Sequence, residues 1–204
     1  MRLLTKTGTA IALAAALSGC SVSSLLGGGS SSKPPATLQT LTAEVPDPGA
    51  IARTAAAGQA VTVAIPAMSK ELKTLRVPVQ LTPTDVQYVS NFRWIDTPDR
   101  LFQQLLEETI RRTTNRVVLN PMQSSLDPGM TVSGEIGRFG YDASTGQVVV
   151  TYDAALGGGN RVETRRFTAS APADGTAGTV GPALNRAANQ VAQDVAKWIG
   201  NSTL

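Results

Sequence analysis

One cysteine and no histidine limit the side-chain chemistry that this 204-residue chain can perform. Without histidine, neither Ser-His-Asp nor Cys-His catalysis can be assembled, and most transition-metal sites lose a principal ligand. Glu107 and Glu108 are adjacent on an expected helix, where they point about 100° apart and cannot share a site. Asp142 and Asp153 fit a turn and a strand surface. We therefore expect no catalytic site, cofactor or metal, and a hydrolase using two carboxylates brought together by the fold is the enzymatic alternative.

The cysteine ends a segment with the three parts of a secretory signal. Two basic residues precede an apolar run, residues 11–17, which is far shorter than the roughly 20 residues that span a bilayer. The sequence Leu17-Ser18-Gly19-Cys20 follows and resembles the lipobox of bacterial lipoprotein signal peptides. Such a signal is cut between Gly19 and Cys20, and the cysteine thiolate carries the lipid. A short membrane helix and a plain secretory signal are the alternatives.

Three segments follow from this interpretation. Residues 1–19 are a signal peptide, residues 20–36 are the lipidated cysteine and a flexible tether, and residues 37–204 are a folded domain. The tether is rich in glycine and serine, which gives it a root-mean-square reach of roughly 20–25 Å. Several acyl chains on Cys20 would make the anchoring stable. Because the cysteine is used by lipid, no intrachain disulfide can form, and the domain depends on its core.

The charge balance does not favour nucleic acid as a partner. Removing residues 1–19 takes away two of the 18 basic residues and none of the 15 acidic ones, so the mature chain carries a net charge of +1. No basic run or stripe occurs, and the pairs Arg111-Arg112 and Arg165-Arg166 are isolated and fit a solvated surface.

The first half of the domain reads as strands followed by a helix. Period-two alternation predicts strands within residues 59–66, 75–81 and 85–90, and Pro78 assigns the second of these to a sheet edge or a bulge. Residues 97–112 predict a helix, because Thr97 suits the N-cap, proline follows, and leucines recur on one face.

The second half repeats this order. Residues 117–119 predict a short strand, residues 131–141 and 147–156 a hairpin, and residues 161–171 a further strand. Residues 180–199 predict an amphipathic helix with Trp198 on its apolar face. This order of strands, helix, strands and helix predicts an α+β fold, in which two amphipathic helices pack on one face of a mostly antiparallel sheet.

The segment between Val61 and Ile110 resembles the PqiC/YmbA-like family of auxiliary lipoproteins of ABC-type transport systems. The similarity runs through VTVAIP and LRVPVQL to YVSNFRWIDTPDRLFQQLLEETI. In that family, an aromatic strand leads through a tryptophan and a proline into a leucine-rich helix. The matching residues are Tyr88, Trp94, Pro98, Leu101 and Leu105. A β-hairpin region and a terminal helix agree in outline, so the resemblance covers nearly the whole domain.

The resemblance implies a non-enzymatic subunit on the periplasmic face of the outer membrane. Its partners would be membrane lipid through Cys20, acylated for example by palmitate, and an MCE-domain protein of an ABC transporter that moves lipid between membranes. Ser21 stands where aspartate is associated with retention at the inner membrane, so outer-membrane sorting fits better. Such a protein would maintain envelope integrity, and self-association into a homo-oligomer is open.

Two alternatives concern how such a subunit works. Tyr88 and Trp94 are candidate partner-binding residues, because tyrosine and tryptophan favour interfaces that are apolar on one side and wet on the other. The same aromatic residues also fit simple packing beneath the helix. A lipid- or glycolipid-binding carrier is the alternative function, and it would need an apolar cavity of roughly 300–1,000 Å³.

Overall fold

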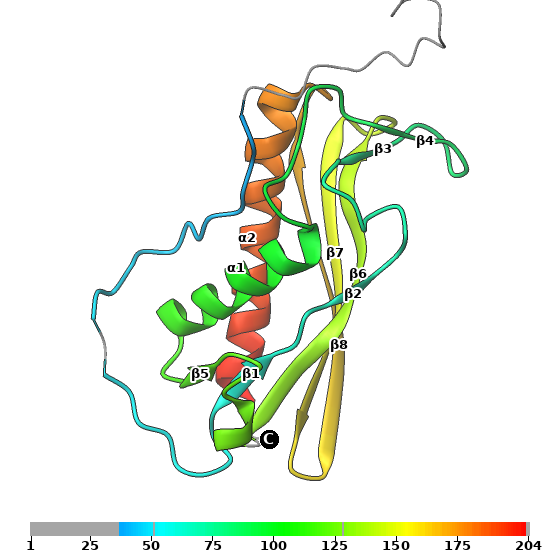
Figure 1. Cartoon of the computed structure of the whole chain (residues 1–204). Coiled ribbons are helices and arrows are strands. Elements are labelled where there is room, and N and C mark those ends of the chain that lie inside the picture. The colour runs from blue at the N-terminus through cyan, green and yellow to red at the C-terminus, as the bar shows by residue number, and fades with distance from the viewer. Residues whose placement is uncertain (1–36, 51, 128, 203–204) are drawn as a thin grey trace, which may run out of the picture. The chain divides into compact units, whose positions relative to one another are not determined.

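The described part of the chain forms a mixed eight-stranded sheet with two helices against one face (Figure 1). The computed structural model describes residues 37–50, 52–127 and 129–202, which belong to one unit, Pro34–Leu204. The helices are α1 (Pro98–Thr113) and α2 (Ala177–Asn201), and η2 (Ser124–Leu126) is a short 3-10 helix. The strands are β1 (Val61–Val63), β2 (Ala67–Met68), β3 (Pro78–Gln80), β4 (Val86–Tyr88), β5 (Val118–Leu119), β6 (Met130–Asp142), β7 (Gln147–Gly158) and β8 (Arg161–Pro172). The predicted α+β class is confirmed.

Three long antiparallel strands, β6, β7 and β8, form the largest part of the sheet. The predicted hairpin is present, and Asp142 pairs with Gln147 across its turn. Along β7, every second side chain is buried, from Val148 to Leu156, so one face of the sheet forms the core and the other remains partly exposed. This period of two is the pattern that made the hairpin predictable.

The prediction of a mostly antiparallel sheet is wrong, because the sheet is mixed. The short strands β1, β2 and β3 follow one another along one edge of β6, and each pairs with it in parallel. β5 also pairs with β1 in parallel. Two strands of one sheet can run parallel only if a long crossover connects them, and α1 lies in the chain between β3 and β6.

Pro78 predicted a sheet edge or a bulge for the second strand. β3 lies between β4 and β6, so the edge position is wrong. Pro78 is its first residue, where a proline is tolerated.

Helix α1 begins where the sequence predicted. Thr97 is the N-cap residue and Pro98 occupies the first turn, although the Thr97 side chain makes no capping hydrogen bond. Arg111 and Arg112 lie in the last turn, where positive charge is favourable to the helix dipole. The buried face of α1 contributes Phe102, whose ring centroid lies 5.1 Å from that of Tyr152 on β7.

Helix α2 packs against α1, β7 and β8. Its apolar positions are buried as predicted, with the exception of Trp198. Trp198 is half-buried, and its ring lies 5.6 Å from that of Phe167 on β8. Trp198 therefore packs against the core from the apolar face of α2, as predicted, but its indole is not fully buried.

Two asparagines of α2 hold the segment that precedes β1. The Asn189 side chain is fully buried. It accepts a 2.8 Å hydrogen bond from the Glu44 amide and donates one of 2.8 Å to the Thr42 carbonyl. One turn earlier, Asn185 accepts from the Thr42 amide and donates to the Glu44 carboxylate. Since residues four apart share a helix face, this extended segment is bound along α2 like an additional strand.

Gly134 is the position in β6 where an added side chain is least tolerated. A Cβ there would lie 2.1 Å from the Asp153 carbonyl oxygen on β7. We expect Gly134→Ala to lower the free energy of unfolding by about 3 kcal/mol, because the two longest strands would have to separate. Gly137 is the matched control, since its added Cβ would meet nothing closer than Thr151 Cγ2 at 3.9 Å. Gly137→Ala should stay within about 0.5 kcal/mol. Urea denaturation measures both, and equal midpoints would contradict the close approach of the strands.

Candidate functional site

The hairpin β3–β4 projects at one end of the sheet (Figure 1) and exposes apolar side chains. Its turn is held by Thr82, whose hydroxyl donates to the Asp85 carboxylate at 2.7 Å and accepts from the Asp85 amide at 3.1 Å. Leu81 and Val86 flank this turn and are 39% and 41% exposed. Within the described sheet, β4 pairs with β3 alone, so the hairpin is an edge of the sheet. Val86 and Tyr88 are two residues apart on one face of β4, and we call them the hairpin patch.

Tyr88 lies half-buried at the base of this hairpin. The Arg76 guanidinium carbon stands 4.0 Å from the centroid of its ring, and its hydroxyl donates to the Glu71 carbonyl at 3.4 Å. A cation–π contact at an exposed site is worth about 0.5–1 kcal/mol. The ring is therefore held in place beside the exposed Val86, as expected for a rigid aromatic contact residue.

Trp94 does not share this surface. It is 1% exposed, and its ring lies 4.8 Å from that of Phe92 and 6.0 Å from that of Phe139. Of the two interpretations of the aromatic cluster, the packing interpretation holds for Trp94. Phe92 and Trp94 are buried and alternate with exposed Arg93 and Ile95, as in an extended segment with one face on the core.

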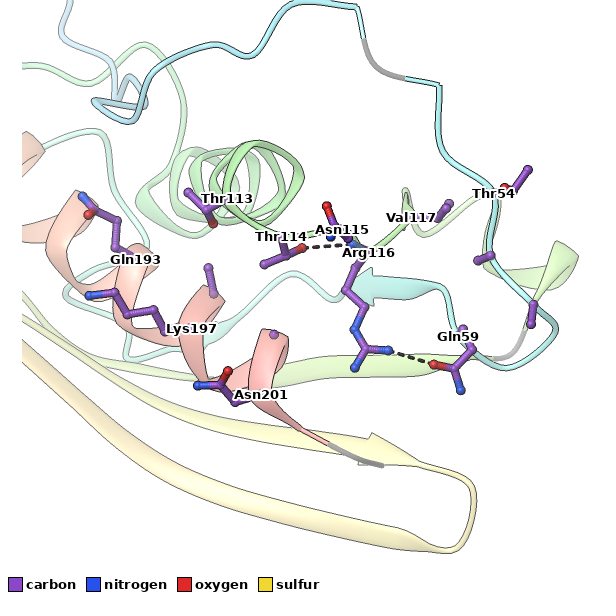
Figure 2. A pocket seen from close by; sticks show the side chains of 14 residues that line it. Thr54, Gln59, Thr113, Thr114, Asn115, Arg116, Val117, Gln193, Lys197 and Asn201 are labelled. Atoms are coloured by element: carbon purple, nitrogen blue, oxygen red, sulfur yellow. Dashed lines mark hydrogen bonds between the residues drawn. The ribbon is translucent and has the colours of Figure 1, made fainter.

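A polar pocket of about 620 Å³ lies where the carboxyl ends of α1 and α2 meet the segment before β1 (Figure 2). Arg116 crosses it, and its guanidinium donates to Gln59 Oε1 and to the Ser202 carbonyl, both at 2.9 Å. Lys197 and Asn201 approach from α2, and Thr113 and Thr114 from the end of α1. Sequence reasoning missed this pocket, because its residues come from three segments that share no motif.

The acidic residues have structural partners. Hydrogen bonds from the Ser144 hydroxyl and Arg138 lower the pKa of Asp142 to about 2, and Arg166 lowers the pKa of Asp153. Burial raises the pKa of Glu107, whereas hydrogen bonds from Arg112 and Arg111 lower that of Glu108. Asp142 and Asp153 thus occupy the turn and the strand surface that the sequence predicted. Among the described residues, no group of three or more histidine, cysteine or acidic side chains could hold a metal ion.

The sequence matches the model of one protein family over residues 40–196, described as the ABC-type transport auxiliary lipoprotein component. The chain belongs to this family. Its membership confirms the resemblance found in the sequence and assigns an auxiliary role beside an ABC transport system. A family of auxiliary transport components also points to a non-enzyme, and a lipoprotein family indicates a membrane-anchored protein of the cell envelope.

Solved structures share the fold of this auxiliary lipoprotein. A Xanthomonas campestris protein of the DUF330 family is 20% identical with a TM-score of 0.68, and the match covers 81% of this chain and 95% of that one. An uncharacterized protein is 17% identical with a TM-score of 0.59, covering 72% and 96%. No protein with a curated description matches the sequence.

The predicted anchor lies outside the described residues. Gly19 and Cys20, with the proposed signal peptide and tether, precede residue 37, which is the first residue that the structure describes. Within the described chain, neither helix is long and apolar enough to cross a bilayer.

Proposed function

We propose that this auxiliary lipoprotein is a non-enzymatic docking subunit of an ABC/MCE-type system that transports lipid between membranes and maintains envelope integrity. In this proposal, acyl chains on Cys20 anchor the domain at the periplasmic face of the outer membrane. The hairpin patch then contacts an MCE-domain protein of the transporter. Family membership supports the auxiliary role, and the anchor and the partner rest on the resemblance in the sequence.

The observation that carries the docking proposal is the exposure of Val86 beside a fixed tyrosine on the same face of β4. Burying such an aliphatic side chain stabilises an interface by about 1.5–3 kcal/mol when the burial is complete. Tyrosine adds a large contact area at little cost in conformational entropy. The patch is also accessible at an edge, where the rest of the sheet does not obstruct a partner.

The filled interior supports docking over the carrier alternative. The space between helices and sheet is occupied by fully buried side chains, such as Phe102, Tyr152 and Leu184. The 620 Å³ pocket is large enough for a ligand, but threonine, asparagine, glutamine and cationic side chains line most of it. Such a surface suits a polar group and is the wrong environment for an acyl chain.

Substitution of Val86 by lysine tests the docking proposal. Because the side chain is exposed, we expect Val86→Lys to fold normally and to lose complementation of a deletion strain, measured as survival in detergent. The physical reason is the cost of burying an unpaired ammonium group at the interface. Site-specific photocrosslinking from position 86 should capture an MCE-domain protein in wild-type envelopes.

Val162 provides the matched control, since it is 71% exposed at the start of β8, next to the β7–β8 turn. That turn lies at the other end of the sheet from the β3–β4 hairpin (Figure 1). Val162→Lys should complement fully. Full complementation by both variants, with no crosslink from position 86, would refute the hairpin patch as the contact. Turnover of a substrate by the purified protein would refute the non-enzymatic role.

A further inference from the structure

The pocket between the two helix ends has an unusual set of lining groups. Two of its side chains are cationic, Arg116 and Lys197, and no carboxylate lines it. Amide and hydroxyl groups supply most of the remaining polar lining, and Figure 2 shows Gln193, Lys197 and Asn201 following one face of α2 toward Arg116. A half-open, polar space of about 620 Å³ falls within the size range of small-molecule sites.

The two cations differ in a way that suits ligand binding. Arg116 is fixed by hydrogen bonds to Gln59 and to the Ser202 carbonyl, and a guanidinium has five N–H donors, so fixing it leaves donors for a ligand. Lys197 is not fixed in this way: its side chain is 72% exposed, and its ammonium lies 3.9 Å from the Asp194 carboxylate. A guanidinium with free donors and an exposed ammonium are both groups that bind phosphate.

Positive charge is concentrated around this pocket. A second pocket, of about 430 Å³, adjoins it and shares Arg116 and Val117. Together the two are lined by five basic residues and two acidic ones, a net charge of +3, whereas residues 20–204 as a whole carry +1. The basic residues are Arg53, Arg111, Arg112, Arg116 and Lys197.

The carboxyl ends of helices carry partial negative charge, which opposes an anion. Here arginines already compensate them. Arg116 donates to the Ser202 carbonyl at the end of α2, and Arg53 donates to the Arg111 carbonyl in the last turn of α1. The negative ends of both helices are therefore offset by arginines and do not exclude an anion from the pocket.

We infer that this pocket binds a phosphate group, carried either by a glycerophospholipid headgroup or by a soluble phosphate ester. Arg116 is the fixed donor and Lys197 the closing cation, while the amides and hydroxyls around them accept or donate to the rest of the headgroup. The inference does not rest on the proposed docking function, because the hairpin patch and this pocket share no residue.

Calorimetric titration of the full-length lipoprotein, held in a phosphate-free neutral detergent, tests the site. The probes are sn-glycerol 3-phosphate and dihexanoyl-phosphatidylglycerol. We expect binding that weakens with added salt. Lys197→Gln should raise the Kd about tenfold, the effect of losing a charge-assisted hydrogen bond. Lys70→Gln, on an exposed loop outside both pockets, should leave the Kd unchanged.

The two probes separate the sources of the phosphate. Tighter binding of dihexanoyl-phosphatidylglycerol supports a lipid headgroup, and binding of sn-glycerol 3-phosphate alone supports a soluble ester. The absence of binding to both probes would overturn the inference. It would also be overturned if Lys197→Gln bound as tightly as wild type, or if Lys70→Gln weakened binding as strongly.

Discussion

Replacing Trp94 by alanine is expected to lower the free energy of unfolding by about 3–5 kcal/mol, the range for truncating a buried tryptophan. The indole is 1% exposed and lies between Phe92 and Phe139, so its removal leaves a cavity that neighbouring rings cannot fill. Its Nε1 is buried without a hydrogen-bond partner among the described residues. Trp94→Phe should be much less destabilising than Trp94→Ala, because phenylalanine leaves a smaller cavity and the loss of the indole N–H breaks no hydrogen bond.

Ile95, the next residue along the chain, is the matched control. It is 60% exposed, and Ile95→Ala should change stability by no more than about 0.5 kcal/mol. Urea denaturation followed by tryptophan fluorescence of Trp198 or by circular dichroism measures all three variants. A Trp94→Ala protein with wild-type stability and lost complementation would contradict the packing role and restore Trp94 as a contact residue.

The elements with strong local signals were predictable from the sequence. In the β6–β7 hairpin, the side chains of β7 alternate between core and surface from Gln147 to Leu156, and the turn residues before β7 interrupt that pattern. α1 has its proline at the start and its arginines at the end, and α2 repeats its apolar residues at helical spacing. Each signal is set by neighbours in the chain, so no tertiary information was needed.

The direction of the short strands was not predictable in this way. β1, β2 and β3 contain two or three residues each, and their burial pattern is the same whether they pair with β6 in parallel or antiparallel. Their direction depends on the crossover through α1, which is a property of the whole topology. Helical spacing likewise placed Trp198 on the apolar face of α2, but spacing does not give the depth to which a residue is buried.

The two candidate sites also differ in whether the local sequence could indicate them. Tyr88 was proposed as a contact residue together with Trp94 because both are large amphipathic aromatics in the segment that resembles the family, and the structure separates the two by burial. The pocket around Arg116 was missed because Gln59, Arg116 and Lys197 lie far apart in sequence and meet only when both helices end at the same place (Figure 2). Isolated arginines in a sequence give no indication that they share one cavity.

The largest functional effect is expected at Cys20. Cys20→Ala should abolish incorporation of a fatty-acid analogue completely, because the thiol is the nucleophile that accepts the lipid and the chain has no second cysteine. The signal would also remain uncut before residue 20, so the precursor should migrate more slowly on a gel. Detergent resistance should fall to the level of the deletion strain, since a domain without its anchor is no longer held at the membrane.

Substitutions of Ser21 provide the control and also test which membrane holds the protein. Ser21→Ala should be labelled and sorted like wild type, because the proposed lipid is carried by Cys20 and not by Ser21. Ser21→Asp should be labelled equally but fractionate with the inner membrane, since aspartate at this position is associated with retention there. Equal labelling of wild type and Cys20→Ala would show that the lipid, if any, is attached elsewhere. Inner-membrane fractionation of the wild type would instead keep the anchor and overturn the proposed outer-membrane location.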